Sequence, residues 1–236
     1  MNHTLNQRKI KYILFLSIAL AISLPWFLRP GYLILLDWQG TPEIPVFQMD
    51  GTGGLSGTLI QLVLFATALF TGSAFAQKLF LFLTLATIGY ATTRLANMLL
   101  PEESPPSIPY IAGVFAMLNP FVYNRIQMGH VYLLAGYALT PLAIIATLKF
   151  IQKPTIRNGC IASLISSLIV VISIHHIILL PLILACFIWI TWKPIKIQLS
   201  HCFSLLIPFL CTAAVLLIVA TSPSSKLHTI NKQDLS

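Results

Sequence analysis

The stretch GVFAMLNPFVYNRIQMGHVYLLAGYALTPLAI, residues 113–144, holds two long apolar runs on either side of a short polar cluster. The members of this cluster are Asn119-Pro120, Asn124, Arg125, Gln127 and His130. Because proline cannot continue the hydrogen-bond ladder of a helix, we expect Asn119-Pro120 to end a helix formed by the first run. The two runs predict helices in an apolar environment, and the polar cluster predicts the turn between them.

The rest of the chain shares this apolar character. Of its 236 residues, 57% are hydrophobic and 8% are charged, whereas soluble domains carry about 25% charged residues. Several apolar runs approach the ~20 residues that a helix needs to cross a hydrocarbon core. The sequence therefore predicts an all-α integral membrane protein.

The net charge of +8 does not indicate a nucleic-acid partner. The Lys and Arg residues fall in short clusters at the ends of apolar runs, where such residues orient helices in a membrane. The four cysteines show no C-x-x-C spacing, so they predict neither a metal site nor a disulfide framework.

Charge distribution also predicts which side of the membrane each turn faces. Apolar segments cover residues 11–28, 55–72, 76–98, 108–123, 130–148, 158–174, 177–192 and 202–220. If all of them crossed the membrane from a cytoplasmic N-terminus, the N-terminus and the inside loops would hold five Lys and Arg residues and the outside loops seven, against the positive-inside rule. If 55–72 instead lies along the external face, the inside holds Arg8, Lys9, Lys11, Arg94, Lys149, Lys153, Arg157, Lys193 and Lys196. Among the loops, Arg29, Lys78 and Arg125 then face outward.

We therefore predict about seven transmembrane helices and one external juxtamembrane helix over 55–72, with the N-terminus in the cytoplasm. Residues 1–220 form the polytopic membrane domain, which includes an external loop over 29–54. Residues 221–236 form a polar external tail, which we interpret as the start of a missing C-terminal part. The expected location is the plasma membrane of a prokaryote.

The external loop carries acidic residues that are candidates for chemistry. Asp37 follows an apolar run and precedes Trp38, so we expect it at the membrane interface. Its carboxylate could act as general base toward an acceptor hydroxyl or as a ligand for a divalent cation such as Mg²⁺ or Mn²⁺. Asp50 is the second candidate in this loop. The alternative is that Asp37 is a solvated loop acid or a helix cap.

Two further candidate groups lie in turns on the same predicted side. Arg125 and His130 flank the turn NRIQMGH, and an arginine fork suits phosphate oxygens, with Asn124 and Gln127 as additional binding residues. The alternative is a snorkelling arginine and a histidine that closes a helix hairpin. The pair His175-His176 could contact a metal or phosphate, although adjacent helical residues point about 100° apart. A hairpin satisfied by backbone carbonyls is the alternative there.

The order of these features resembles the N-terminal half of GT-C type integral-membrane glycosyltransferases. An acidic residue soon after the first span, a juxtamembrane helix and a span beginning near AQKLFLFLTLATIGYATTRLA carry the resemblance. The closest local match is LNPFVYNRIQMGHVYLLAGYALTPL. The resemblance extends to protein mannosyltransferases, aminoarabinose transferases and YfhO-like membrane proteins, and it covers about residues 10–220.

The resemblance implies transfer of a sugar from a polyprenyl-phosphate donor to a glycan, lipid or protein acceptor at the external face. It implies that Asp37, with Asp50 second, is the catalytic base or metal ligand, and that Arg125 and His130 hold the lipid phosphate. The chain departs from the family in having one acid at LLDWQG and in its shorter length. A non-enzymatic translocase or transporter of lipid-linked glycans, or a structural membrane subunit, is the alternative.

Overall fold

The computed structural model describes residues 2–33, 35, 54–173 and 175–190. Within these ranges every regular element is an α-helix, which confirms the all-α prediction for the described part of the chain. In chain order the helices are α1 (Asn2–Leu28), α2 (Gly54–Thr71), α3 (Ser73–Leu99), α4 (Ile108–Leu118), α5 (Pro120–Gln127), α6 (Val131–Gln152), α7 (Ile156–Ile172) and α8 (His176–Ile190).

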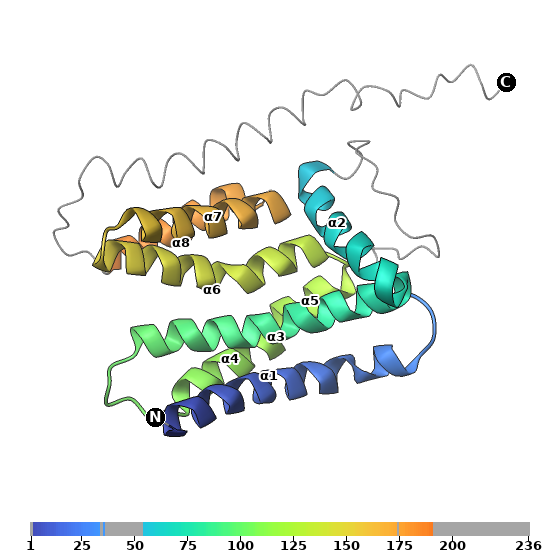
Figure 1. The fold of residues 1–236 in the computed structure, drawn as a ribbon, viewed down its shortest axis with the longest axis horizontal. Coiled ribbons are helices and arrows are strands. Elements are labelled where there is room, and N and C mark those ends of the chain that lie inside the picture. Colours follow the sequence, from blue (N-terminus) through green and yellow to red (C-terminus); the bar gives the residue numbers. More distant parts are fainter. Residues whose placement is uncertain (1, 34, 36–53, 174, 191–236) are drawn as a thin grey trace, which may run out of the picture.

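The helices form a bundle, and α2 lies across one end of this bundle. Figure 1 shows α1, α3, α6, α7 and α8 lying roughly along the long axis of the molecule, whereas α2 lies obliquely across one end. Of the described helices, α3 and α6 are long and apolar enough to cross a membrane. The apolar parts of the other described helices are shorter, so the number of transmembrane helices stays a prediction.

Three buried clusters hold the bundle together, and α6 contributes to each; one of them packs α2 against α6 and α7. The largest cluster joins α1, α3, α4, α5 and α6 around Phe15, Leu85 and Met117. A smaller one joins α6, α7 and α8 around Ile169 and Leu180. Because contacts between helices that are distant in sequence bury these side chains, the bundle is one packed unit.

The change of direction between α2 and α3 takes a single residue, Gly72. Its φ of 80° and ψ of 151° lie in a region that is essentially restricted to glycine. The Gly72 N–H donates to the Ala68 carbonyl at 2.8 Å, and the Ala76 N–H donates to the Gly72 carbonyl at 3.0 Å. One helix therefore ends and the next begins at Gly72, which allows α2 to lie across the end of the bundle while α3 runs along it.

The first helix of the opening stretch ends at the polar cluster, as the sequence predicts. α4 ends at Leu118, and the Asn119 Oδ1 accepts a hydrogen bond from the Val122 N–H at 2.9 Å. This is an N-cap followed by proline at the first helical position, both of which favour the start of a helix. The expected helix end at Asn119-Pro120 is confirmed. The expected apolar segment 108–123 is wrong as a single element, because the cap starts α5 inside it.

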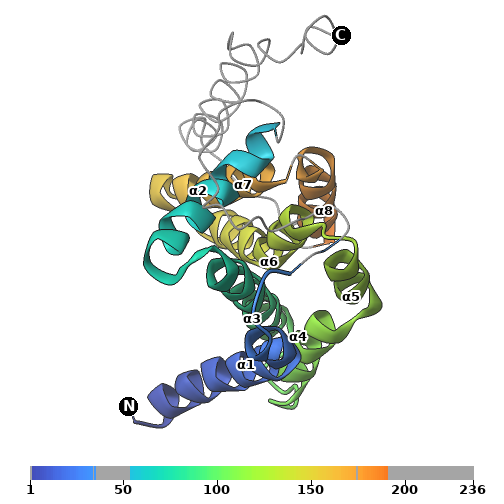
Figure 2. The same ribbon diagram turned by 90° about the vertical axis from the view of Figure 1, so that its right-hand side faces the viewer.

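Several turns of the chain meet at the end that α2 crosses. Residues 29–33, 72–78, 124–131, 173, 175 and 176 all reach this end, which we call the polar end (Figure 2). These ranges are far apart in sequence, so only the alternating directions of the helices bring them to one end of the bundle.

Candidate functional site

Arg125 and His130 form a direct side-chain contact at the polar end. Arg125 Nη1 lies 2.7 Å from His130 Nδ1. Because a guanidinium has only N–H donors, Nδ1 must accept this bond, and the proton of the neutral imidazole then sits on Nε2. The Arg125 Cζ also lies 5.2 Å from the centroid of the Phe121 ring, within the range of a cation–π contact. The structure thus brings together the two residues that the sequence proposed as a pair.

A glycine turn produces this contact. Gly129 has a φ of 74°, a conformation that glycine adopts at little cost. Its N–H donates to the Ile126 carbonyl, and the His130 N–H donates to the Arg125 carbonyl, each at 3.0 Å. These two bonds form a Schellman motif, which satisfies the last carbonyls of α5 and folds the chain back over the helix end. The motif places His130 beside Arg125.

Arg125 has unused hydrogen-bonding capacity. Its Nε is buried and has no hydrogen-bond partner in the part of the chain that the structure describes. An unsatisfied buried donor costs about 1–3 kcal/mol, and more when the group is charged. An anion with two oxygens would satisfy a guanidinium edge with two parallel bonds. Asn124 and Gln127 lie on the same helix and are exposed.

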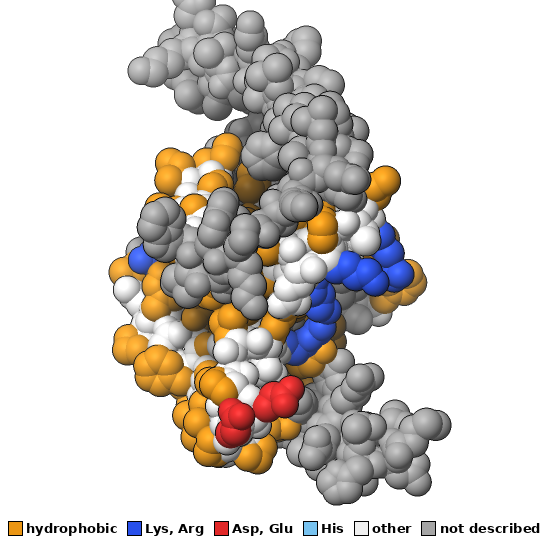
Figure 3. All heavy atoms as spheres, turned by 90° about the vertical axis from the view of Figure 1, so that its left-hand side faces the viewer, with side chains coloured by type: hydrophobic (Ala, Val, Ile, Leu, Met, Phe, Trp, Pro, Cys, Tyr) orange, Lys and Arg blue, Asp and Glu red, His pale blue; other side chains and the backbone are white. Residues whose placement is uncertain are grey.

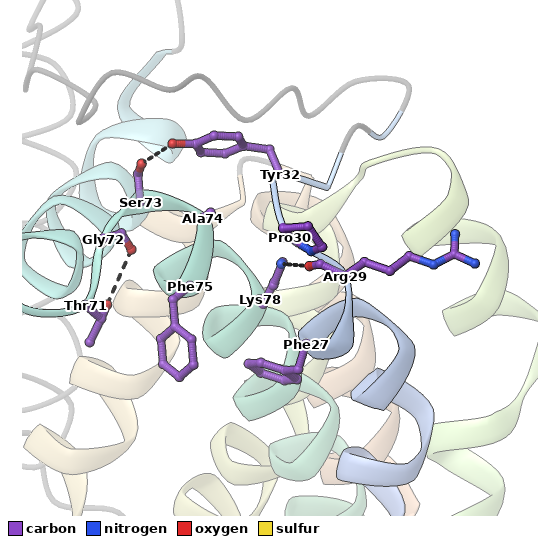
Figure 4. A pocket seen from close by; sticks show the side chains of 10 residues that line it. All are labelled: Phe27, Arg29, Pro30, Tyr32, Thr71, Gly72, Ser73, Ala74, Phe75 and Lys78. Carbon is purple, nitrogen blue, oxygen red and sulfur yellow. Dashed lines mark hydrogen bonds between the residues drawn. The ribbon is translucent and has the colours of Figure 1, made fainter.

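A second part of the polar end is a cavity of about 600 Å³ between the end of α1 and the α2–α3 junction. Figure 4 shows Lys78 pointing toward the chain after α1, where its Nζ donates to the Arg29 carbonyl at 2.7 Å. The Lys78 side chain is only 6% exposed. The Arg29 guanidinium points away from Lys78 (Figure 4). The sequence predicts Lys78 only as an external charge, although its place in the first turns of an apolar helix is a signal that it could be buried.

The chain that leads from α1 into the external loop is attached to α3. The Gln77 side chain donates to the Leu33 carbonyl at 2.8 Å and accepts from the Leu33 N–H at 2.9 Å. The Tyr32 hydroxyl lies 2.7 Å from the Ser73 Oγ. These bonds hold the root of the loop at the polar end.

The two adjacent histidines lie in different environments. His175 is exposed in the turn between α7 and α8. His176 is 1% exposed, and its Nδ1 has no hydrogen-bond partner among the described residues. Its imidazole packs on Gly136 of α6, where an added Cβ would lie 2.7 Å from Nδ1. Only His175 is therefore accessible to a ligand.

The acidic candidates Asp37 and Asp50 lie outside the described residues. Within the described ranges, no three His, Cys, Asp or Glu side chains are close enough together to hold a metal ion. The polar end that the structure does describe therefore carries two cationic, hydrogen-bonding features: the Arg125–His130 pair and the cavity lined by Lys78. Such features suit an anion.

Comparison of the chain with known protein families, with curated proteins and with solved structures found no match.

The attachment of the loop root gives a first prediction. Replacing Gln77 with alanine removes both bonds to Leu33, and each hydrogen bond contributes about 0.5–1.5 kcal/mol. We expect amide hydrogen exchange of residues 29–33 to become roughly tenfold faster, which corresponds to about 1.4 kcal/mol of local stability. Exchange over α6 is the internal reference and should not change. Replacing the exposed Gln127 with alanine is the matched control, and equal acceleration in both variants would contradict the prediction.

Proposed function

We propose that the chain is an integral-membrane glycosyltransferase that moves a sugar from a polyprenyl-phosphate donor to an acceptor at the external face. The observation that best supports this is the composition of the polar end. Arg125 and Lys78 lie at the same end of the bundle as Leu33, which is four residues before Asp37. Glycosyl transfer from a lipid phosphate requires a group that binds the phosphate and an acidic residue near it. Both parts are expected at this end of the bundle.

In this proposal Arg125 binds the donor phosphate. Cleavage of the sugar–phosphate bond leaves negative charge on the phosphate, and a guanidinium held in place stabilises that charge as it develops. The His130 bond and the Phe121 ring orient the guanidinium before the donor arrives. Pre-orientation matters because less side-chain freedom is then lost on binding.

In this proposal Asp37 acts on the acceptor, as the general base. A carboxylate can take the proton of the acceptor hydroxyl as this oxygen attacks a sugar with oxocarbenium character. A Mg²⁺ or Mn²⁺ ion, if the reaction uses one, would be held by Asp37 and would offset charge on the phosphate. Attachment of Leu33 to α3 limits how far the start of the loop can move from the polar end.

The proposed topology follows from the same arrangement. α1, α3, α4 with α5, α6, α7 and α8 cross the membrane, and the segment 202–220 supplies the seventh crossing. α2 lies along the external face. The polar end faces outward and the N-terminus lies in the cytoplasm of a prokaryotic cell, because this orientation leaves most Lys and Arg residues inside.

Binding of a lipid phosphate tests the role of Arg125. With radiolabelled undecaprenyl phosphate in nanodiscs of neutral lipid, we expect Arg125→Gln to weaken retention by about tenfold or more, because hydrogen bonds to charged groups contribute about 1.5–3 kcal/mol. Arg125→Lys should recover only part of the loss, since an ammonium lacks the planar fork.

Arg29→Gln is the charge-matched control, because the exposed Arg29 side chain lies at the same end and its guanidinium points away from Lys78 (Figure 4). Its thermal unfolding midpoint and that of Arg125→Gln are measured alongside. Equal retention by Arg125→Gln and the unmodified chain, or an equal loss in Arg29→Gln, would remove Arg125 as the phosphate-binding residue.

A further inference from the structure

A basic pocket lies at the opposite end of the bundle from the proposed catalytic site. It is a cavity of about 370 Å³ between α3, α6 and α7, and each helix contributes one cation: Arg94, Lys149 and Arg157. Figure 3 views the molecule from this end and shows Lys and Arg side chains gathered in a patch. Lys and Arg at helix ends also orient membrane proteins, so the charges alone do not define a site.

The three cations are not neutralised by the described protein. None of them forms an ion pair with a residue that the structure describes, where the acidic residues are Glu102 and Glu103. Arg94 is held with its Cζ 5.7 Å from the centroid of the Tyr90 ring. Like charges around one cavity repel each other, and an anion within it would turn that repulsion into attraction. The charges therefore favour a phosphate group in the pocket.

The pocket continues from its charged mouth into an apolar wall. On α6, Leu142 and Ile145 precede Lys149 by seven and four residues, so the three side chains follow one face of the helix. On α7, Ile161 and Ile165 follow Arg157 with the same four-residue spacing. At 1.5 Å per residue, this wall extends about 10 Å from the charged mouth along the bundle axis. A ligand that fills the cavity must be charged at one end and apolar at the other.

We propose that this pocket binds an anionic phospholipid, with the phosphate among Arg94, Lys149 and Arg157 and the first part of an acyl chain along the isoleucine wall. The first turn of α7 adds the positive end of its helix dipole to the phosphate side. A free phosphate or a nucleotide would use the cations but would leave the apolar wall without a partner. A lipid in this position would join α3, α6 and α7 at the end where the topology predicts the cytoplasm.

Native mass spectrometry of the detergent-solubilised full chain tests the proposal with two probes, palmitoyl-oleoyl phosphatidylglycerol and the corresponding phosphatidylcholine. We expect retained phosphatidylglycerol and little phosphatidylcholine. Each of Lys149→Gln and Arg157→Gln should weaken phosphatidylglycerol retention about fivefold, and the double variant about 25-fold. Ile161→Gln, at a partly exposed position, should weaken lipid retention without creating or removing a charge.

Lys153→Gln is the matched control, because this exposed lysine lies in the turn from α6 to α7 but does not line the pocket. The proposal is overturned by equal loss in Lys153→Gln, by equal retention of both lipids, or by unchanged retention in the double variant. Displacement of the lipid by millimolar inorganic phosphate, with Ile161→Gln unaffected, would assign the pocket to a free anion instead. Unfolding midpoints of all variants are measured, and a loss confined to variants that have unfolded also overturns the proposal.

Discussion

Replacing Gly113 with valine is expected to lower the free energy of unfolding by roughly 3 kcal/mol, the upper part of the usual range for overpacking a core. Gly113 lies where α4 crosses α3 and α1. A Cβ at this position would lie 2.6 Å from the Gly89 carbonyl oxygen and 2.8 Å from the Phe15 Cζ, and it would overlap the Thr93 Oγ1. A side chain could rotate away, but the Gly89 oxygen belongs to the backbone of α3.

The consequence of that contact is a displacement of α4 as a whole. Small residues let helix backbones approach closely, and a larger residue forces them apart. Separation of α3 and α4 would expose the cluster around Leu85 and Met117, which holds most of the larger core. Because the Gly89 carbonyl oxygen is a backbone atom and cannot rotate away, we expect even Gly113→Ala to be destabilising, by about 1 kcal/mol.

Thermal unfolding in detergent, followed by tryptophan fluorescence, measures this effect. For a chain of this size, a loss of roughly 3 kcal/mol corresponds to a midpoint lower by about 6–12 °C. Ile111→Val is the control on the same helix, since Ile111 is 64% exposed and loses one methyl group without touching α3. Midpoints that agree between Gly113→Val and Ile111→Val would show that the α3–α4 crossing tolerates a side chain.

Replacing Asp37 with asparagine is expected to slow glycosyl transfer by about 10²–10⁴-fold, the usual contribution of a general base. Asparagine keeps the shape of the side chain but cannot accept a proton from the acceptor hydroxyl. Under the proposed function, the assay is release of undecaprenyl phosphate from a sugar-linked donor in proteoliposomes, with the unmodified chain as reference. Undecaprenyl phosphate binding at Arg125 should be unchanged in this variant, which separates a lost base from a lost donor site.

Two further measurements distinguish the roles open to Asp37. If it holds a metal ion, chelation should inhibit the unmodified chain, and excess Mn²⁺ should partly restore Asp37→Asn. Asp50→Asn is the control in the same loop, with a smaller effect expected because Asp50 is the second candidate. Full turnover by Asp37→Asn would remove it as base and as ligand. Movement of an intact donor across the bilayer by the unmodified chain would favour the translocase alternative.

Local backbone rules explain why some of the candidate site could be predicted from the sequence. Asn119-Pro120 ends a helix because the amide caps the next one and proline lacks an N–H. Gly129 allows the tight turn that brings Arg125 and His130 within 2.7 Å. Both features depend on residues within a few positions of each other. The spacing in NRIQMGH was therefore enough to predict that Arg125 and His130 lie close together.

Other parts of the site could not be read from the sequence, because they depend on neighbours far along the chain. Lys78 can be buried because the Arg29 carbonyl, 49 residues earlier, accepts a hydrogen bond from its Nζ. Gln77 reaches Leu33 across 44 residues. His175 and His176 are equivalent in the sequence, yet only His176 is enclosed, because Gly136 of α6 leaves room for its ring.

For the residues that the structure describes, the sequence by itself determined the helical character, most helix ends and the Arg125–His130 turn, since composition and short-range backbone geometry decide these features. The tertiary structure alone decided which polar side chains are buried, which turns share an end of the bundle, and that Arg94, Lys149 and Arg157 surround one cavity. The physical reason is that burial and convergence are set by helix packing. Packing brings together residues that are far apart in the sequence, and their separation along the chain does not predict their distance in space.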